Sequence, residues 1–413
     1  MKKTLAMILA GGRGSRLHPL TEHRTKPAVP FGGIYQIIDF TLSNCINSNL
    51  RKIMLMTQYK SSSLTRHLNS AWNIFTRDLG EFIEVLPPQK RIGDVWYRGT
   101  ADAVFQNLYH LEAHQPEHVL VLGGDHIYKM NYETMIQEHR ERDADATIAV
   151  IDVPRDQATE FGVLQVNQNF EIVGFQEKPD NPDPMPNNPD RCLVSMGLYC
   201  FQRDPLVHQL KNHEDNPDYT HDFGHDILPA MVKGGETVYA HQFDDQNRGD
   251  ERYWRDVGTV ESYYEANMDL VDVSPQFNLY DRDWPIRTFH PQYPPAKFVF
   301  DDDGCRGMAV DSIVAHGVIL SGAEVKRSVL SPGVHVGRGT TVKNSILMDD
   351  VRIGAGAHIE NTIIDKRARI PENTVLGKDP SSDAENHYVT DQGLTVVRRN
   401  YPEKRGEIFE TYD

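Results

Sequence analysis

The sequence has few of the features that mark secreted, membrane-spanning or nucleic-acid-binding proteins. It contains only four cysteines in 413 residues, without CxxC pairs or histidine-rich spacing, so we expect buried, reduced thiols. No apolar run approaches the roughly 20 residues that a membrane helix needs, and no signal peptide precedes the first predicted strand. A formal net charge of -16 opposes binding to a polyanion. We therefore expect a cytoplasmic protein with no nucleic-acid and no membrane partner.

The first 150 residues alternate between short apolar runs and longer amphipathic stretches, which is typical of a mainly parallel sheet with helices on both faces. The predicted strands are Thr4–Leu9, Ile53–Thr57, Phe82–Leu86, Val119–Leu122 and Thr147–Val153. The predicted helices are Thr41–Ser48, Ser61–Trp72, Ala101–Glu112 and Tyr132–Arg142. Because ligands of such sheets bind at the carboxyl ends of the strands, the segments after residues 9 and 122 are expected at one edge.

The pattern changes after Phe161. Hairpin-like strands are predicted at Phe161–Val166, Glu171–Phe175 and Leu193–Phe201, with a proline-rich loop at 180–189. Helix or strand returns over Ile227–Val232 and Val238–Phe243, and a last helix is predicted at Val260–Val271. These features predict one α/β domain over residues 1–271, followed by a linker over residues 272–311.

Residues 312–413 carry a hexapeptide pattern. Aliphatic residues stand six apart in several series, which are Ile313, Ile319 and Val325; Leu330, Val336, Val342 and Met348; Ile353 and Ile359; Ile364 and Ile370. This period predicts a left-handed parallel β-helix, with these side chains pointing inward. The irregularities near 326–330 and 343–348 predict loops or changes of register, and Tyr388–Asp413 is expected as a strand or loop on the surface.

A glycine-rich loop, AGGRGSR (residues 10–16), follows the first strand. Gly11, Gly12 and Gly14 let the backbone turn and its N–H groups approach an anion, while Arg13, Arg16 and Lys26 add positive charge. A polyphosphate is the simplest ligand for such a loop. The loop is neither a Walker motif nor a clean dinucleotide fingerprint, and a turn without a ligand is the alternative.

Acidic residues follow two further predicted strands. Asp125, after a strand and two glycines, is placed to hold Mg²⁺ against substrate phosphates, and Asp256 offers a second carboxylate. For Asp256 a helix cap or an ion pair is an equal alternative. Glu177 and Lys178 could bind sugar hydroxyls and a phosphate, or form an exposed ion pair. The stretch WYRGTAD (residues 96–102) could stack on and read a base, or simply begin a helix with Thr100 as its cap.

Taken together, the motifs resemble those of the bacterial ADP-glucose pyrophosphorylase family. The matching motifs are LAGGRGSRL (9–17) with KP (26–27), SNCINS (43–48), WYRGTADA (96–103), GDHIYK (124–129), FGV (161–163), EKP (177–179), SMGLY (195–199) and WRDVGT (254–259). The resemblance covers about residues 4–395. It implies a Rossmann-like nucleotidyltransferase sheet with a C-terminal left-handed β-helix, and a homotetramer. The implied reaction joins ATP and α-D-glucose 1-phosphate to ADP-glucose and pyrophosphate for glycogen synthesis, under the control of small-molecule allosteric effectors.

The resemblance also implies roles for individual residues. Triphosphate contacts fall on Gly11, Gly12, Arg16 and Lys26, and adenine-facing positions fall on Gln58, Gly99, Thr100 and Ala101. The glucose 1-phosphate contacts fall on Tyr97, Gly162, Glu177, Lys178 and Ser195. Mg²⁺ ligands fall on Asp125 and Asp256, with Asp125, Arg16 and Lys26 as the catalytic set.

The sequence departs from the enteric members of this family at their regulatory positions. His23 replaces an activator-binding lysine, whereas Arg24 is retained; Pro30 and Gln36 replace a histidine and an arginine, and Ala113 replaces an inhibitor-binding arginine. We therefore expect fructose 1,6-bisphosphate activation and AMP inhibition to be weak or replaced by other effectors. A pyrophosphorylase for another nucleotide or sugar, a non-catalytic regulatory subunit and a hexapeptide acyltransferase are the alternative functions.

Overall fold

A computed structural model describes residues 3–88, 96–185, 188–212, 219–247, 249, 251–302 and 305–399. Contacts divide the chain into two units that interleave along the sequence. The first unit comprises Met1–Arg13, Ile38–Trp254 and Asp281–Arg287, and the second comprises Gly14–Ile37, Arg255–Tyr280 and Thr288–Asp413, as far as their residues are described. The division into an α/β domain over residues 1–271, a linker over 272–311 and a C-terminal domain over 312–413 remains a prediction.

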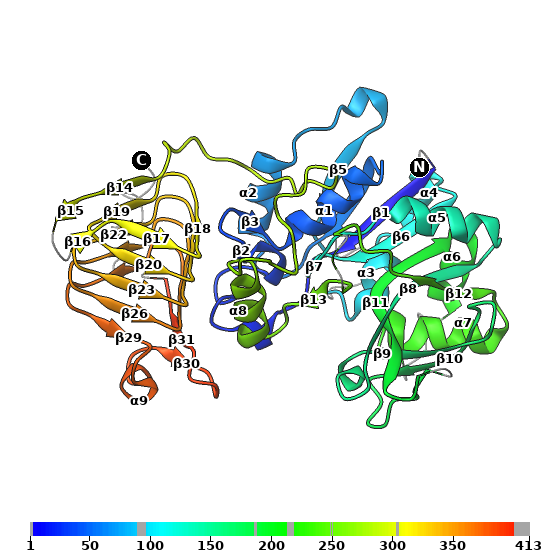
Figure 1. The fold of residues 1–413 in the computed structure, drawn as a ribbon. Helices are drawn as coiled ribbons and strands as arrows, with labels where there is room; N and C mark the ends of the chain where they lie inside the picture. The colour runs from blue at the N-terminus through cyan, green and yellow to red at the C-terminus, as the bar shows by residue number, and fades with distance from the viewer. Residues whose placement is uncertain are drawn as a thin grey trace. The chain divides into compact units, whose positions relative to one another are not determined.

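A nine-stranded mixed sheet forms the centre of the first unit (Figure 1). Its strands are β1 (Thr4–Leu9), β4 (Lys52–Met56), β5 (Phe82–Leu86), β6 (His118–Gly123), β8 (Ala146–Pro154), β9 (Gly162–Val166), β10 (Ile172–Glu177), β11 (Arg191–Gln202) and β12 (Val238–Gln242). The order is β10-β9-β11-β6-β1-β4-β5, and β8 pairs with both β11 and β12. Pairs β6/β1, β1/β4 and β4/β5 are parallel, which confirms the predicted parallel arrangement for this part of the sheet.

Helices cover both faces of this sheet. They are α1 (Ile38–Asn47), α2 (Ser62–Ala71), α3 (Thr100–Phe105), α4 (Leu108–His114), α5 (Tyr132–Glu141), α6 (Arg203–Asn212) and α7 (Leu228–Gly234). Leu5 and Met7 of β1 share a core cluster with side chains of α3, α4, α6 and α7. On the opposite face, Ile8 lies beside Gly124, which also adjoins Ile38 of α1. A strand that is covered on both sides must be apolar throughout, as the run at residues 4–9 is.

β11 is antiparallel to β6, β8 and β9, as the hairpin-like pattern after Phe161 predicts, so this half of the sheet is mixed. One detail of the first unit differs from the sequence-based expectation. The helix predicted over Ala101–Glu112 is two helices, α3 and α4. Asn107 interrupts it with a non-helical backbone, and its side chain donates to the carbonyl of Ala103 at 2.8 Å. Asparagine side chains compete for backbone groups in this way and so favour helix ends.

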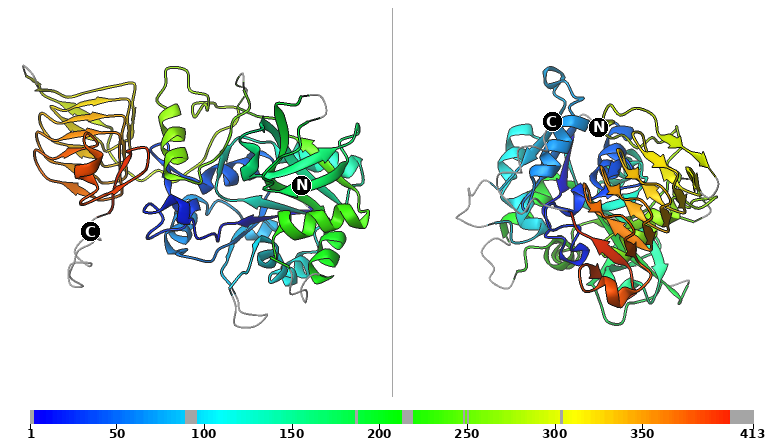
Figure 2. Two further views of the ribbon diagram at one scale, coloured as in Figure 1. Left: turned by 90° about the horizontal axis from the view of Figure 1, so that it is seen from below. Right: turned by 90° about the vertical axis from the view of Figure 1, so that its left-hand side faces the viewer.

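The second unit contains a β-helix made of three stacks of parallel strands (Figures 1 and 2). The first stack is β14 (Lys297–Val299), β19 (Ile319–Ser321), β22 (His335–Val336), β25 (Arg352–Ile353) and β28 (Arg369–Ile370). The second is β17 (Met308–Val310), β20 (Glu324–Lys326), β23 (Thr341–Lys343), β26 (His358–Glu360) and β29 (Val375–Leu376). The third is β18 (Ile313–Val314), β21 (Val329–Leu330), β24 (Ile346–Leu347), β27 (Thr362–Ile364) and β31 (Thr395–Val397), with β30 (Tyr388–Val389) antiparallel to β31. The predicted left-handed β-helix is confirmed. Four of the strands of this unit, β14, β15 (Asp301–Asp302), β16 (Cys305–Arg306) and β17, lie within the predicted linker.

The inward register of the β-helix is partly different from the prediction. Leu320 and Leu347 are fully buried in its core, whereas Ile313 and Ile319 are only partly buried. The six-residue spacing contracts to five at each step from the second to the third stack, as between Val325 and Leu330. The predicted register changes near 326–330 and 343–348 are therefore confirmed. A shift of one residue turns every side chain of a strand to the opposite face, so inward positions counted strictly by six fail there.

Helix α8 (Val260–Asp269) packs on both the N-terminal segment and the β-helix of the second unit. Tyr263 donates to the carbonyl of Pro30 at 2.6 Å, and Tyr264 donates to the carbonyl of Asn344 at 2.7 Å. Asn267 accepts from the backbone of Gly32 at 2.9 Å. Residues 14–37, which form β2 (Pro30–Phe31) and β3 (Tyr35–Gln36), belong to this unit for that reason.

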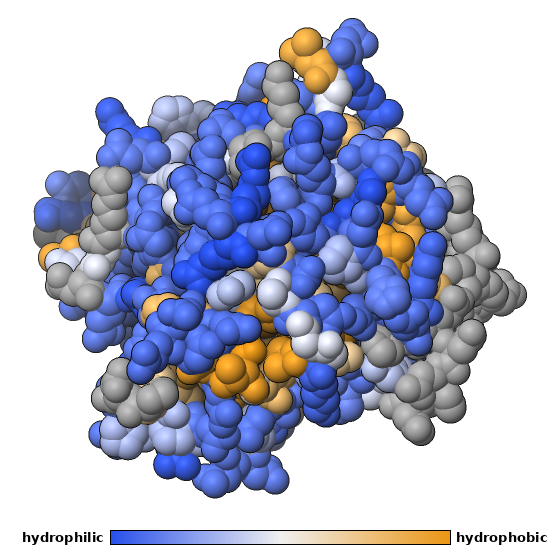
Figure 3. All heavy atoms as spheres, turned by 90° about the vertical axis from the view of Figure 1, so that its right-hand side faces the viewer, coloured by the Kyte–Doolittle hydropathy of each residue, from blue (hydrophilic) through white to orange (hydrophobic). Residues whose placement is uncertain are grey.

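Several expectations concern surface segments. Residues 388–399 contain β30 and β31, but β31 is buried and Val397 lies in the core of the β-helix, so the expected surface position is wrong for this strand. Residues 400–413 of the predicted C-terminal strand or loop lie outside the described residues, as do residues 186 and 187 of the proline-rich loop. Within the described part of the chain, no helix has the length and apolarity to cross a bilayer. Figure 3 shows a mainly hydrophilic face, as expected for an acidic chain whose apolar residues lie in its cores.

Candidate active site

The glycine loop at the end of β1 lies against the end of β4. Ala10 donates its backbone N–H to the carbonyl of Met56 at 2.9 Å. A Cβ on Gly11 would lie 3.0 Å from the Cβ of Gln58, whereas one on Gly12 would have no protein atom within 4 Å. Gly11 therefore allows two loops to meet, and the backbone at Gly12 borders open space that a ligand can reach.

Gln58 and Tyr97, which the motifs placed in different subsites, contact each other. The backbone N–H of Tyr97 donates to Gln58 Oε1 at 2.9 Å, and Gln58 Nε2 lies 3.4 Å from the carbonyl of Tyr97. The Tyr97 hydroxyl accepts from Asn107 at 3.0 Å, and burial raises the pKa of Tyr97. The amide of Gln58 thus holds the start of the WYRGTADA stretch in place.

Gly99, Thr100 and Ala101 of that stretch pack against the segment before the π-helix Phe223–Ile227. A Cβ on Gly99 would lie 2.7 Å from the carbonyl carbon of His221, so only glycine fits. Thr100 donates to Asp222 Oδ2 at 2.8 Å, and Ala101 donates its N–H to the His221 carbonyl at 2.9 Å. The alternative role of this stretch as a helix start is therefore present, but the predicted cap is wrong, because Gly99 is the N-cap and Thr100 is the first residue of α3.

His221 and Asp222 were missed from the sequence. Asp222 caps the π-helix, because its Oδ1 accepts from the N–H groups of Gly224 at 2.8 Å and His225 at 3.2 Å. An aspartate one residue before a helix is an ordinary cap signal, and the sequence did show that. Its second bond, to Thr100, joins positions 122 residues apart, which no local pattern predicts.

Glu177 and Lys178 lie where β10 ends. A Cβ on Gly162 would lie 2.9 Å from Glu177 Oε2, and one on Gly224 would lie 2.6 Å from the same oxygen. Burial raises the pKa of Glu177, while the Lys178 ammonium 3.3 Å away opposes that shift. Lys178 keeps 60% of its side chain exposed, so its charge remains available to a ligand. The predicted Glu177–Lys178 ion pair is therefore present, and two glycines line the carboxylate.

Ser195 lies on β11, where the pairing with β8 shifts register between Ser195 and Tyr199. Its hydroxyl accepts from the backbone N–H of Gly197 at 3.1 Å, and the residue is buried. A bulge of this kind changes the direction of side chains along a strand.

Asp125 follows β6 and begins a turn into β7 (His126–Tyr128). Its side chain is 36% exposed, and its Oδ1 lies 3.7 Å from His126 Nε2. A Cβ on Gly124 would lie 2.8 Å from Ile38, so the turn packs closely on α1. The carboxylate thus stands at the carboxyl end of a central strand, as predicted, and remains accessible.

In the second unit, Lys26, Arg16 and Asp256 of β13 (Trp254–Asp256) form a group of charges. Lys26 Nζ lies 2.5 Å from Asp256 Oδ1, and the Lys26 side chain is 9% exposed. Arg16 lies 3.9 Å from Asp256 Oδ2 and is 62% exposed. The ion pair that was the alternative role of Asp256 is therefore present, and its carboxylate, 25% exposed, is still accessible to a cation.

The three predicted regulatory residues have different surroundings. His23 is partly exposed and lies 3.9 Å from Glu22. Gln36 lies on β3 and is half-buried. Arg24 is buried, and its Nη2 donates to both oxygens of Asp365 at 2.7 and 2.8 Å. Arg24 thus joins the N-terminal segment to the β-helix within the second unit.

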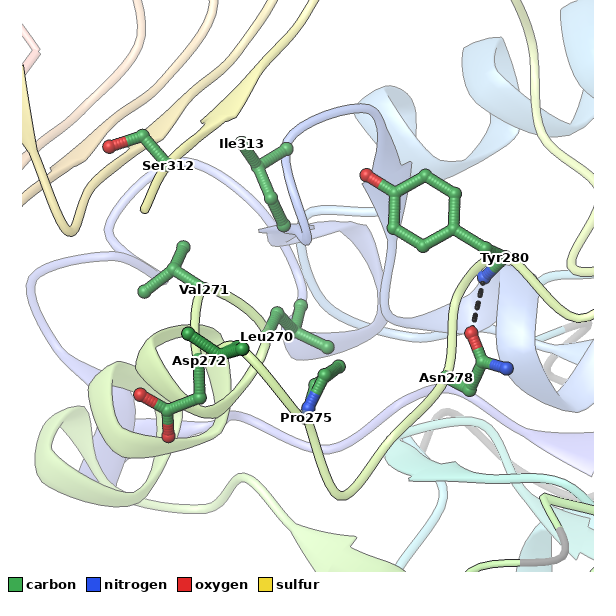
Figure 4. A pocket seen from close by; sticks show the side chains of 9 residues that line it. Leu270, Val271, Asp272, Pro275, Asn278, Tyr280, Ser312 and Ile313 are labelled. Carbon is green, nitrogen blue, oxygen red and sulfur yellow. Dashed lines mark hydrogen bonds between the residues drawn. The ribbon is translucent and has the colours of Figure 1, made fainter. Parts of the chain in front are cut away.

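A pocket of about 460 Å³ in the second unit contains none of the predicted site residues (Figure 4). It lies beside the segment after α8, where the Tyr280 N–H donates to Asn278 Oδ1 at 2.9 Å. Its lining residues are Leu270, Val271, Asp272, Val273, Pro275, Asn278, Tyr280, Ser312 and Ile313.

Comparison with known proteins covers both parts of the chain. The nucleotidyl transferase family model matches residues 5–273, and the GlmU-like C-terminal hexapeptide model matches residues 294–397. A glucose-1-phosphate adenylyltransferase of Rhodopirellula baltica is 54% identical over 404 residues, which is 97% of this chain and 90% of that protein. Those of Hydrogenovibrio crunogenus and Koribacter versatilis are 52% and 51% identical, over 96% and 97% of this chain and 94% and 96% of their own lengths. This chain belongs to the glucose-1-phosphate adenylyltransferase family.

Proposed function

We propose that this chain transfers the adenylyl group of ATP to α-D-glucose 1-phosphate, giving ADP-glucose and pyrophosphate for glycogen synthesis. The observation that carries this proposal is the group at the end of β10. The Glu177 carboxylate, lined by Gly162 and Gly224, can accept hydrogen bonds from sugar hydroxyls, and the exposed Lys178 ammonium beside it suits a phosphate. A sugar phosphate carries both kinds of ligand group, hydroxyls for the carboxylate and a phosphate for the ammonium. Tyr97 and Ser195 complete the proposed glucose 1-phosphate site.

The nucleotide is proposed to bind along the glycine loop and the WYRGTADA stretch. Gly11 and Gly12 would present backbone N–H groups to the triphosphate, and Arg16 and Lys26 would neutralise its charge. Gln58, Gly99, Thr100 and Ala101 would face the adenine. Because Gln58 also fixes the backbone of Tyr97, it would link the positions of the base and the sugar phosphate.

Asp125 and Asp256 are proposed as ligands of Mg²⁺. Their accessible carboxylates fit this ion, because Mg²⁺ prefers hard oxygen ligands together with substrate phosphates. When bound, the ion would neutralise developing charge on the phosphates. For Asp256 this role requires the carboxylate to serve a cation besides Lys26.

The protein's own contribution is alignment and charge neutralisation. The attacking phosphate has a second pKa of about 6, so most of it is dianionic at pH 7 and needs no general base. In-line displacement at the α-phosphorus then requires that Lys178 orient the sugar phosphate while Lys26 and Arg16 stabilise the leaving pyrophosphate. Asp125 is proposed to act mainly in the transition state and Lys178 mainly in substrate binding.

Two substitutions test this division. Lys178→Ala should raise the KM for glucose 1-phosphate by about 10- to 100-fold with a smaller fall in kcat. Asp125→Asn should instead lower kcat strongly with little change in that KM. Lys211→Ala, which removes an exposed lysine from α6, is the matched control and should behave as wild type. An unchanged KM in Lys178→Ala would contradict the proposed sugar phosphate site. Pyrophosphate release measured with four nucleoside triphosphates and several sugar 1-phosphates tests the substrate preference.

We further propose a cytoplasmic homotetramer controlled by small-molecule effectors that act near His23 and Gln36. The burial of Arg24 argues against direct effector contact at that residue. A kinetic screen of phosphorylated sugars, pyruvate, AMP, ADP and phosphate tests the regulation, and sedimentation analysis tests the tetramer. Strong activation by fructose 1,6-bisphosphate together with strong inhibition by AMP would contradict the expected departure from the enteric enzymes.

A further inference from the structure

The SNCINS motif at residues 43–48 has no role in the proposed substrate contacts, yet its polar side chains form hydrogen bonds to other segments of the first unit. It lies at the end of α1, and Ser43, Asn44 and Ser48 are buried. Two segments bind to this helix. One is the turn that carries Asp125, and the other is a strap, residues 281–287, by which the chain returns to the first unit.

One side of α1 holds the chain on both sides of the Asp125 turn. Thr41 Oγ1 donates to the carbonyl of Gly123 at 3.0 Å, just before the turn. Asn44 Nδ2 donates to the carbonyl of Tyr128 at 3.1 Å, at the end of β7, the short strand that follows the turn, and Asn44 Oδ1 accepts from Met130 N–H at 3.2 Å. Residues three apart on a helix lie on one face, so the two contacts span the turn from a rigid base.

The neighbouring side of α1 holds the strap. Ser43 Oγ accepts from the N–H of Arg287 at 2.8 Å, and Asn47 Nδ2 donates to the carbonyl of Pro285 at 3.0 Å. Trp284 Nε1 donates to Asn44 Oδ1 at 2.8 Å, the same oxygen that binds Met130. Asn44 is therefore the residue of the motif that bonds both to the strap and to the chain after Asp125.

A second connection joins the strap to the same turn. Lys129, which follows β7, has no exposed side-chain surface, and its Nζ lies 3.2 Å from Asp281 Oδ2. A buried ammonium needs such a partner, because an unpaired charge is costly to bury. The strap thus contacts the Asp125 turn through an ion pair at Lys129 and through Asn44.

We propose that the strap positions Asp125 by acting through Asn44, so that Trp284 and Asn44 are positioning residues for adenylyl transfer. This inference rests on the proposed role of Asp125. Asn44 touches no proposed substrate contact; it fixes the backbone on the far side of the turn, and the indole N–H fixes the Asn44 amide. Loss of that N–H lets the amide rotate and the turn shift, which misaligns the Asp125 carboxylate.

The test compares Trp284→Phe, which removes the N–H but keeps an aromatic ring, with the matched control Asn47→Ala, which removes a strap bond that does not involve Asn44. Because small displacements of catalytic groups cost large factors in rate, we expect kcat to fall about tenfold in Trp284→Phe, with both KM values within about twofold. Asn47→Ala should stay within about twofold of wild type. Equal losses in the two variants would overturn the assignment to Asn44.

Two further readouts separate positioning from mere stability. Mn²⁺ binding in the presence of ATP, followed by electron paramagnetic resonance, should weaken several-fold in Trp284→Phe. Trp284→Phe added to Asn44→Ala should lower kcat no further than Asn44→Ala alone, because both act through one amide. A lower melting temperature with unchanged kcat and Mn²⁺ binding would overturn the inference.

Asp281→Asn provides a second variant if Trp284→Phe does not fold, and it should also lower kcat through Lys129. Asp125→Asn, assayed alongside, distinguishes the proposed role of Asp125 from the proposed roles of the residues that position it. If Asp125→Asn remains active, the proposed function of Asp125 fails. If Asp125→Asn is inactive while Trp284→Phe and Asp281→Asn match wild type, only the positioning role fails.

Discussion

Arg24 provides the sharpest prediction about stability, because the motif resemblance placed it among the regulatory residues and the structure buries it. Arg24 and Asp365 are 5% and 4% exposed, and one guanidinium nitrogen lies 2.7 and 2.8 Å from the two carboxylate oxygens. The Asp365 carboxylate also accepts from the N–H of Lys366 at 2.7 Å. Arg24→Met would leave a buried carboxylate without its cation.

Breaking a buried ion pair by removing one partner costs about 3–5 kcal/mol, so Arg24→Met should destabilise the folded chain by that amount. Replacing both members, in Arg24→Met with Asp365→Asn, should recover part of the loss because no unpaired charge remains buried. Urea-induced unfolding at a fixed protein concentration measures both differences. The exposed Lys343→Met, on β23, is the control and should change stability by less than about 0.5 kcal/mol.

The same variants also decide between the two roles of Arg24. If Arg24→Met unfolds within about 1 kcal/mol of wild type and loses its response to effectors, the reasoning from burial is refuted and Arg24 is an effector contact. If the loss is about 3–5 kcal/mol and the remaining folded protein still responds to effectors, Arg24 is structural.

Two further predictions concern a pair of glycines and a buried histidine. Gly99→Ala should lower the free energy of unfolding by about 1–3 kcal/mol and disturb α3, because its Cβ would overlap the His221 backbone. Gly12→Ala should keep wild-type stability and raise the KM for ATP. Thermal unfolding and kinetics check both variants, and a Gly99→Ala variant as stable as wild type would contradict the close contact. Burial lowers the pKa of His139 to about 4 against 6.5 when unfolded, so the unfolded chain binds more protons between these values. The free energy of unfolding should therefore fall by up to about 3 kcal/mol as the pH drops from 7 to 4. His139→Gln should lose that part of the pH dependence when unfolding is measured at several pH values. The same dependence of stability on pH in His139→Gln and wild type would contradict this prediction.

Much of the fold could be predicted because its signals are local. The apolar run of β1 and its glycine loop, the alternation of strands and helices, and the hexapeptide period all lie within short windows. What could not be predicted depends on partners that are distant in sequence. The inward position of Leu320 instead of Ile319 depends on five-residue steps elsewhere in the coil, and the split between α3 and α4 depends on Asn107 bonding to Tyr97 and Ala103.

The candidate site shows the same limit. Single motifs named Gly162, Glu177 and Lys178, but only the fold shows that Gly224, 47 positions beyond Glu177, lines the same carboxylate. The sequence offered two roles for Asp256, and the structure shows its ion pair with Lys26. For Arg24 the motif carried no information about burial, because its partner Asp365 is separated from it by 341 residues.

The most direct test of the central claim is the rate of ADP-glucose formation from ATP and glucose 1-phosphate by wild type and by Asp125→Asn. We expect steady formation by wild type, and at least about a hundredfold lower kcat in Asp125→Asn with little change in either KM, because one group that stabilises the transition state is lost. The Asp125→Asn variant should keep the circular dichroism spectrum of wild type, which shows that it is folded. No ADP-glucose from the wild-type chain, or full activity in Asp125→Asn, would contradict the account.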